Sequence, residues 1–125
     1  MNDTTKVIAL INAALKSCGK NVVFQETFPS AIYPRICFEI KQIGGVSQIQ
    51  SYSVGVDLWA RETPYSALHA KLDLIESKIC GYTCEDFGTV WVENNLDRLV
   101  IPDSDKTIQH IRQTFTLKAC FVEKE

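Results

Sequence analysis

The sequence lacks the features that would place it in a membrane or a secretory pathway. No apolar run approaches the roughly 20 residues that a membrane-spanning helix needs. The first residues, Met1 to Lys6, lack the basic start and the uninterrupted apolar segment of a secretory signal. We therefore expect a globular protein without a membrane partner, made and kept in a cytoplasm.

The common signatures of nucleotide binding and hydrolysis are also missing. There is no Walker loop, dinucleotide fingerprint, zinc-protease helix or nucleophile elbow. The 13 basic and 15 acidic residues are interspersed, so the formal net charge is −2 and no basic patch stands out. Because sequence-independent binding to phosphates depends on clustered Lys and Arg, we do not expect tight nucleic-acid binding.

The five cysteines give no sign of a disulfide framework or a metal site. Their number is odd and their spacing wide, which is typical of free thiols in a reducing compartment. Cys80 and Cys84 form the only close pair, but three residues separate them and no second Cys/His pair completes a zinc site. We expect no metal and no cofactor.

Catalysis has few candidate residues. His69 and His110 are the only side chains whose ordinary pKa suits a general base near neutrality. A cysteine-dependent hydrolase built on Cys37 or Cys120 with His110 is one hypothesis, and it needs a tertiary contact that the sequence cannot show. The more economical interpretation assigns no catalytic residue and predicts that the protein is not an enzyme.

The most informative stretch runs from Gln50 to Cys80. Between Tyr52 and Arg61, apolar residues alternate with the period of a half-buried strand. From Pro64 to Ile79 they recur at three- and four-residue steps, as in an amphipathic helix. Thr63 has the side chain of an N-cap, Pro64 suits the first helical position, and Gly81 is a helix stop.

The remaining patterns predict one domain, 1–125, of the α+β class. A helix from Asp3 or Thr4 to Cys18-Gly19 precedes the strands, and Gly81 to Gly88 and Asn94 to Arg98 have the composition of irregular and turn segments. We predict a mostly antiparallel sheet with two helices packed on one face, in the order α-β-β-β-α-β-β. Besides 52–61, the predicted strands are Asn21–Phe28, Arg35–Ile43, Thr89–Glu93 and Thr107–Val122, the last in the interior.

Two places suggest contact with other proteins. Gly44-Gly45 permits a tight hairpin turn, and Gln48 and Gln50 make the tip polar, either as a solvated turn or as a contact surface. Trp59 lies on the outer side of its strand, where it either covers the sheet or forms an interface.

The layout resembles a known family. The strand Pro34-Arg35-Ile36-Cys37-Phe38-Glu39-Ile40, and the strand Val54-Gly55-Val56-Asp57-Leu58-Trp59-Ala60-Arg61 leading straight into Thr63-Pro64-Tyr65 and a helix, are similar to the tail terminator and tail completion proteins of long-tailed bacteriophages. The likeness covers nearly the whole chain in layout, and other small phage neck proteins share its motifs.

The resemblance implies a structural role without catalysis. Such proteins form rings, commonly hexamers, which cap the tail tube and join it to the head, so the implied partners are copies of this chain, the tail tube protein and head-tail connector proteins. The protein would be in the host cytoplasm during assembly and then in the virion tail. Projecting segments would make the contacts, here Gly44 to Ser51 and Asn94 to Asp105. The candidate contact residues are Gly44, Gly45, Gln48, Gln50, Trp59, Asp97, Arg98, Asp103 and Asp105.

Two alternatives remain open beside this role and the hydrolase. The protein could be another phage neck or minor capsid protein. It could also be a small α+β protein-binding module that uses the outer sheet face around Trp59.

Overall fold

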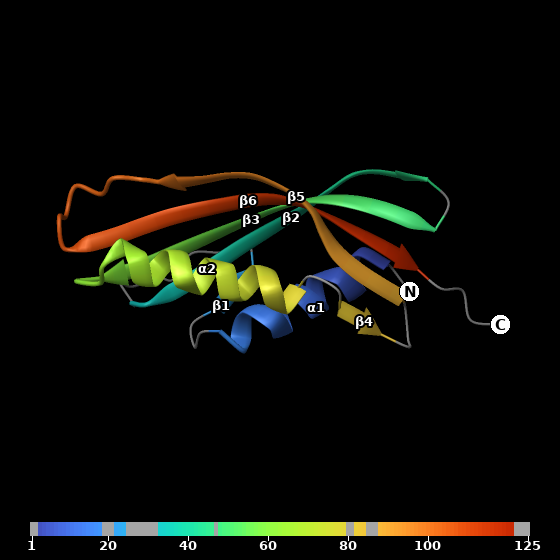
Figure 1. The fold of residues 1–125 in the computed structure, drawn as a ribbon, viewed down its shortest axis with the longest axis horizontal. Coiled ribbons are helices and arrows are strands. Elements are labelled where there is room, and N and C mark those ends of the chain that lie inside the picture. The colour runs from blue at the N-terminus through green and yellow to red at the C-terminus, as the bar shows by residue number, and fades with distance from the viewer. Residues whose placement is uncertain are drawn as a thin grey trace.

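The computed structural model describes residues 3–18, 22–24, 33–46, 48–79, 82–84 and 88–121. Two helices lie against the same face of one sheet (Figure 1), so the predicted α+β class is confirmed. In chain order the elements are α1 (Asp3–Lys16), β1 (Val22–Phe24), β2 (Arg35–Val46), β3 (Ile49–Arg61), α2 (Tyr65–Ile79), β4 (Tyr82–Cys84), β5 (Gly88–Val100) and β6 (Ile108–Phe121).

The sheet has six strands in the order β1-β2-β3-β6-β5-β4. Every neighbouring pair is antiparallel except β1 and β2, which are parallel. β3 pairs with β6 along its whole length, from Ile49 opposite Cys120 to Arg61 opposite Ile108. The prediction that the last long strand lies in the interior is therefore confirmed.

The core forms where the apolar stripes of both helices meet the inner face of the sheet. α1 buries Val7, Ile11 and Leu15, which are four residues apart and so share one helix face. α2 buries residues at steps of four, three and four, namely Leu68, Leu72, Ile75 and Ile79, which also share one helix face. At about 1.5 to 3 kcal/mol for each large apolar side chain, the α2 stripe contributes about 6 to 12 kcal/mol before the entropy of ordering is subtracted.

The corner between β3 and α2 is made differently from the prediction. Glu62 adopts a left-handed conformation with φ of 52°, and its N–H donates to the Thr107 carbonyl at 2.7 Å. The Thr63 hydroxyl donates to the Arg61 carbonyl at 3.0 Å, while its N–H donates to the Gln109 side chain at 2.9 Å. Thr63 therefore fastens the corner to β3 and β6, whereas we predicted an N-cap.

The hairpin between β2 and β3 also differs from the prediction. Gly44 and Gly45 pair with Ser51 and Gln50 inside the ladder, and the chain reverses between Val46 and Ile49. A register shift between Gln42 and Gly44 marks a bulge, and Gly44 has φ of 155°, which favours glycine. The Gly-Gly pair therefore permits a bulge and a close strand contact; it is not the turn.

Two predictions about the segment after α2 are wrong. Tyr82–Cys84, predicted to be irregular, forms the short strand β4, which pairs with the start of β5. The predicted turn at 94–98 lies inside β5, which continues to Val100 because two register shifts absorb its turn-forming residues.

Some predictions lie outside the described residues: the helix stop at Gly81 and, of the strand predicted over Asn21–Phe28, residues 21 and 25–28. In the part of the chain that the structure describes, neither helix is long and apolar enough to cross a membrane.

Candidate functional site

The outer face of the sheet carries a network of charged side chains centred on Asp57. One carboxylate oxygen of Asp57 lies 2.8 Å from Nε2 of His110, and the other accepts a hydrogen bond from Arg112 at 2.5 Å. Arg112 also pairs with Glu39 on β2. These contacts join β2, β3 and β6 across the face, so each charge is matched by a neighbour on another strand.

The charge of Arg112 is held firmly by this network. Burial alone would lower the pKa of its guanidinium, but the hydrogen bond to Glu39 and the negative charges of Asp57 and Glu39 outweigh burial and raise the pKa. Arg112 therefore stays charged at any physiological pH, and its part in the network is to bind strands together.

Trp59 lies between His110 on β6 and Arg35 on β2, on the same face of the sheet. Its ring stacks on His110 with centroids 4.0 Å apart, and the Arg35 guanidinium lies 4.6 Å from its ring centroid. Arg35 also lies 5.1 Å from the ring of Tyr33, which in turn is 5.0 Å from the Arg61 guanidinium. Trp59 thus covers the sheet; a role in contact with another protein stays a prediction.

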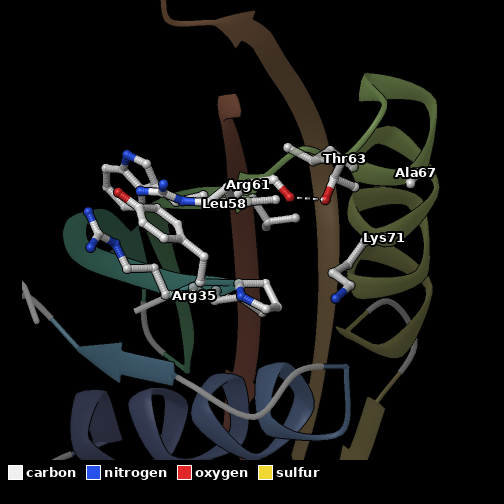
Figure 2. A pocket seen from close by; sticks show the side chains of 12 residues that line it. Arg35, Leu58, Arg61, Thr63, Ala67 and Lys71 are labelled. Carbon is white, nitrogen blue, oxygen red and sulfur yellow. Dashed lines mark hydrogen bonds between the residues drawn. The ribbon is translucent and has the colours of Figure 1, made fainter. Parts of the chain in front are cut away.

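A pocket of about 430 Å³ opens beside these rings, where β2 begins and β3 leads into α2. Its floor is apolar and is formed by Ile36, Leu58, Ala60 and Leu68, all of which belong to the core. Figure 2 shows Lys71 reaching from α2 on one side and Arg35 and Arg61 on the other. We call this cavity the basic pocket.

The hairpin between β2 and β3 presents apolar side chains near its tip. Ile43 is 52% exposed and Ile49 is 40% exposed. Gln50 lies across Gly45, where an added Cβ would be 2.7 Å from its side-chain carbonyl carbon, and accepts a hydrogen bond from Gln42. The predicted contact residues Gly44, Gly45, Gln48 and Gln50 therefore lie together at this end of the sheet.

The opposite end carries a second exposed apolar pair. At the end of β5, Leu99 is 57% exposed and Val100 is 41% exposed. β5 is paired with β4 only along Gly88–Val90, so most of its outer edge lies beyond β4. This pair falls inside the segment 94–105, the second predicted contact region.

Arg98 and Asp97, both predicted contact residues, already have partners within the chain. Arg98 donates to Gln113 at 2.6 Å, forms an ion pair with Asp73 at 3.0 Å and lies 3.2 Å from Nδ1 of His69. The Asp97 carbonyl accepts from Gln113 at 3.0 Å. Arg98 therefore fastens β5 to α2 and β6, while the Asp97 side chain is exposed.

Asp103 and Asp105 shape the turn between β5 and β6. Asp103 accepts from the Asp105 N–H at 2.9 Å, and Asp105 accepts from the N–H and the hydroxyl of Thr107 at 2.9 and 2.7 Å. The two hydrogen bonds from Thr107 lower the pKa of Asp105. The Asp105 carboxylate also lies 4.0 Å from the Arg61 guanidinium. Both residues lie at the Trp59 end of the sheet.

The predicted contact residues thus form two groups and not one site. β3 has 13 residues, so at about 3.3 Å per residue its ends are about 40 Å apart. The glutamine-rich tip lies at one end, and Trp59 with the turn of Asp103 and Asp105 lies at the other, as Figure 1 shows for the two connections.

The thiol and imidazole groups of the hydrolase hypothesis are not brought into a working pair. Cys120 lies ten residues along β6 from His110, about 33 Å at strand spacing. Cys37 is buried, and burial chiefly raises the pKa of its thiol despite nearby Arg35, while Asp57 raises it further. His110 is engaged with Asp57 and Trp59. Among the described residues, no three His, Cys, Asp or Glu side chains gather as a metal site.

Comparison with known proteins finds similar folds but no match in sequence. No protein family and no curated protein matches the sequence. The fold is similar to that of a solved protein that carries only a sequence identifier as its name, with a TM-score of 0.67, 10% identity, and coverage of 99% of this chain and 100% of that one. It is also similar to a chain of the virion of a native gene transfer agent particle, with a TM-score of 0.56, 9% identity, and coverage of 90% and 85%. At these identities the likeness shows the fold.

The sequence alone did not single out the residues that now define these surfaces. The exposed apolar residues Ile43, Ile49, Leu99 and Val100 are typical of strand interiors in composition, and only their burial separates them from the core. Lys71 and Arg35 come from a helix and a strand, so their meeting at the basic pocket depends on the tertiary fold.

Proposed function

We propose that this protein is a structural component of a phage-like particle, and specifically a tail terminator or tail completion protein. In this role it forms a ring on the head-proximal end of the tail tube, stops tube growth and joins the tail to the head. The fold likeness to a chain of a gene transfer agent virion supports the first part of this proposal. The layout of strands and helices that resembles phage tail terminators supports the second.

The observation that carries the proposal is the placement of two exposed apolar pairs at opposite ends of the sheet. Closed rings other than dimers are built from head-to-tail contacts, in which each copy presents two different surfaces to its neighbours. The hairpin tip, with Ile43 and Ile49, and the end of β5, with Leu99 and Val100, are two such regions. A neighbouring copy or the tail tube would remove this apolar area from water, which favours association.

No turnover of a substrate is part of this proposal. Asp57 and Arg112 on the outer face are matched by each other and by His110 and Glu39, and the two thiols considered for catalysis are either buried or distant from His110. A structural role uses these groups as links between strands.

Incorporation into particles tests the proposal. Leu99→Ser and Ile49→Ser each remove one exposed apolar side chain from a predicted contact region, and mass spectrometry of purified particles measures how much of each variant is retained. We expect both variants to be depleted. Leu74→Ser is the matched control, because Leu74 is a 45% exposed apolar residue on α2 outside both regions. Equal incorporation of all three variants would count against these surfaces.

A stand-alone protein-binding module is the second candidate. The basic pocket beside Trp59 favours it, since a concave site with few polar groups suits a ligand. If this protein were absent from purified particles, the result would support this alternative.

A further inference from the structure

The basic pocket concentrates positive charge in a chain that is slightly acidic overall. Arg35, Arg61 and Lys71 line it, and no carboxylate is among the described residues that do so. Lys71 forms no ion pair within the described part of the chain, and the Arg61 link to Asp105 is 4.0 Å long between two exposed groups. A net charge of −2 spread over the whole chain makes this local excess of cations distinctive.

One of these cations has a hydrogen-bond donor that no described residue satisfies. Nε of Arg35 is buried and makes no hydrogen bond with any residue that the structure describes. A buried polar group of this kind costs free energy unless a ligand supplies an acceptor. Arg35 is also held by the rings of Tyr33 and Trp59, so its guanidinium is oriented before any ligand arrives.

The apolar floor narrows the choice of ligand. Ile36, Leu58 and Leu68 line the deep part of the pocket, and a bare phosphate or a nucleic-acid backbone would leave this surface wet. An apolar side chain would fill it, and a carboxylate beside that side chain would meet the cations at the rim. The pocket is large enough, at about 430 Å³, for one such side chain together with its neighbour.

We propose that the basic pocket binds a peptide segment of a partner protein in which a large apolar side chain is flanked by carboxylates. The apolar side chain enters between α2 and the ends of β2 and β3, and the carboxylates pair with Arg35 and Lys71. This assignment concerns the isolated protein and does not depend on its place in a particle.

NMR titration of the ¹⁵N-labelled protein tests the proposal with a defined probe. The probe is a peptide of the sequence Gly-Glu-Leu-Glu-Gly, blocked at both ends so that only its side chains are charged. We expect saturable shifts of amides that border the pocket, around Arg35, Ala60 and Leu68. A peptide with Gln in place of Glu should bind about tenfold more weakly, since a hydrogen bond between charged groups adds about that factor to a binding constant. A peptide with Ser in place of Leu should also bind more weakly.

Three variants distinguish binding at the pocket from general charge attraction. Lys71→Gln should weaken binding of the probe about tenfold, whereas Lys78→Gln, a change of the same kind on the last turn of the same helix, should leave binding unchanged. Ala67→Phe fills the mouth of the pocket from an exposed helix position and should block binding without altering any charge. Thermal unfolding of each variant establishes that it is folded.

Several results would overturn the proposal. These are equal binding of the Glu and Gln peptides, equal loss in the Lys71 and Lys78 variants, or shifts that map away from the pocket. Saturable binding of inorganic phosphate or of a short oligonucleotide at the pocket, stronger than that of the peptide, would overturn the choice of ligand.

Discussion

The guanidinium of Arg112 lies directly over the α-carbon of Gly55 on the outer face of the sheet. A Cβ at position 55 would be 2.8 Å from the guanidinium carbon and 3.1 Å from a carboxylate oxygen of Glu39. Gly55 therefore provides the space through which Arg112 reaches both Asp57 and Glu39, and so links the three central strands.

Replacing Gly55 should disturb this link. Gly55→Ala is expected to lower the free energy of unfolding by about 1 to 2 kcal/mol, because Arg112 must give up part of its pairing with Asp57 and Glu39. Urea unfolding followed by circular dichroism measures the change. In an Arg112→Met background the same substitution should be neutral or stabilising by about 0.4 to 1 kcal/mol, since alanine restricts the unfolded chain. An equal cost in both backgrounds would show that Arg112 is not the cause.

Among the strand side chains whose burial the structure describes, Gln113 is the one buried polar side chain. It donates to the Asp97 carbonyl at 3.0 Å and accepts from Arg98 at 2.6 Å. Gln113→Met keeps the side-chain volume but removes the acceptor for the Nε–H of Arg98 and the side-chain donor to the Asp97 carbonyl, which should destabilise the protein by about 1 to 3 kcal/mol in the same unfolding experiment. Gln48→Met, at an exposed position, should stay within about 0.5 kcal/mol of the parent.

Cys37 should react slowly with alkylating reagents. Its side chain is buried, and burial raises the pKa of the thiol, so the reactive thiolate is scarce and shielded. Labelling with iodoacetamide at pH 8, mapped by mass spectrometry, should be at least about tenfold slower at Cys37 in the native protein than in urea. Cys18, which is partly exposed, is the internal comparison and should differ much less. Rapid native labelling of Cys37 would contradict its burial.

The raised pKa of Cys37 also affects the stability of the protein in alkali. A thiol whose pKa is raised in the folded state stabilises the protein fully below the pKa of the unfolded chain, about 8.5, and this contribution is lost as the pH rises through the folded value. Cys37→Ala should therefore reduce the dependence of the unfolding free energy on pH above about 8.5. An unchanged alkaline dependence would mean that Cys37 titrates alike in both states.

The turn between β5 and β6 should loosen in acid. Hydrogen bonds from the side chain and backbone of Thr107 hold the pKa of Asp105 below its ordinary value. A depressed pKa stabilises the turn above the unfolded value, about 3.9, and this stabilisation is lost as the pH falls through the folded pKa. An NMR titration of the Thr107 amide should show a midpoint below about 3.9. Thr107→Val should raise that midpoint, while Thr107→Ser should keep it low because the hydroxyl remains.

The periodic elements could be predicted because one physical requirement, burial of a face, repeats along each of them. The α2 stripe of Leu68, Leu72, Ile75 and Ile79 and the alternation of β3 and β6 are of this kind. A turn is predicted where β5 continues, because Asn94, Asn95 and Asp97 are residue types that favour turns. Inside the strand they lie at two bulges, which only the pairing with β6 reveals.

The candidate site was harder to predict because it depends on register. A turn centred on Gly44-Gly45 would place Arg35 opposite Val54, whereas the observed turn places it opposite Trp59. That shift brings Arg35 to the rings and to the basic pocket. The left-handed corner at Glu62 was equally hidden, since no glycine or asparagine marks it.

The length of tails made without this protein tests the central claim most directly. The gene would be deleted from the genome that encodes it, and the lengths of the tails that this genome produces would be measured by electron microscopy with and without a plasmid copy. If the protein terminates the tail, the deletion gives tubes of uncontrolled length that are not joined to heads, and the plasmid copy restores a single length. Tails of normal length, joined to heads in the absence of the protein, would contradict the proposed role.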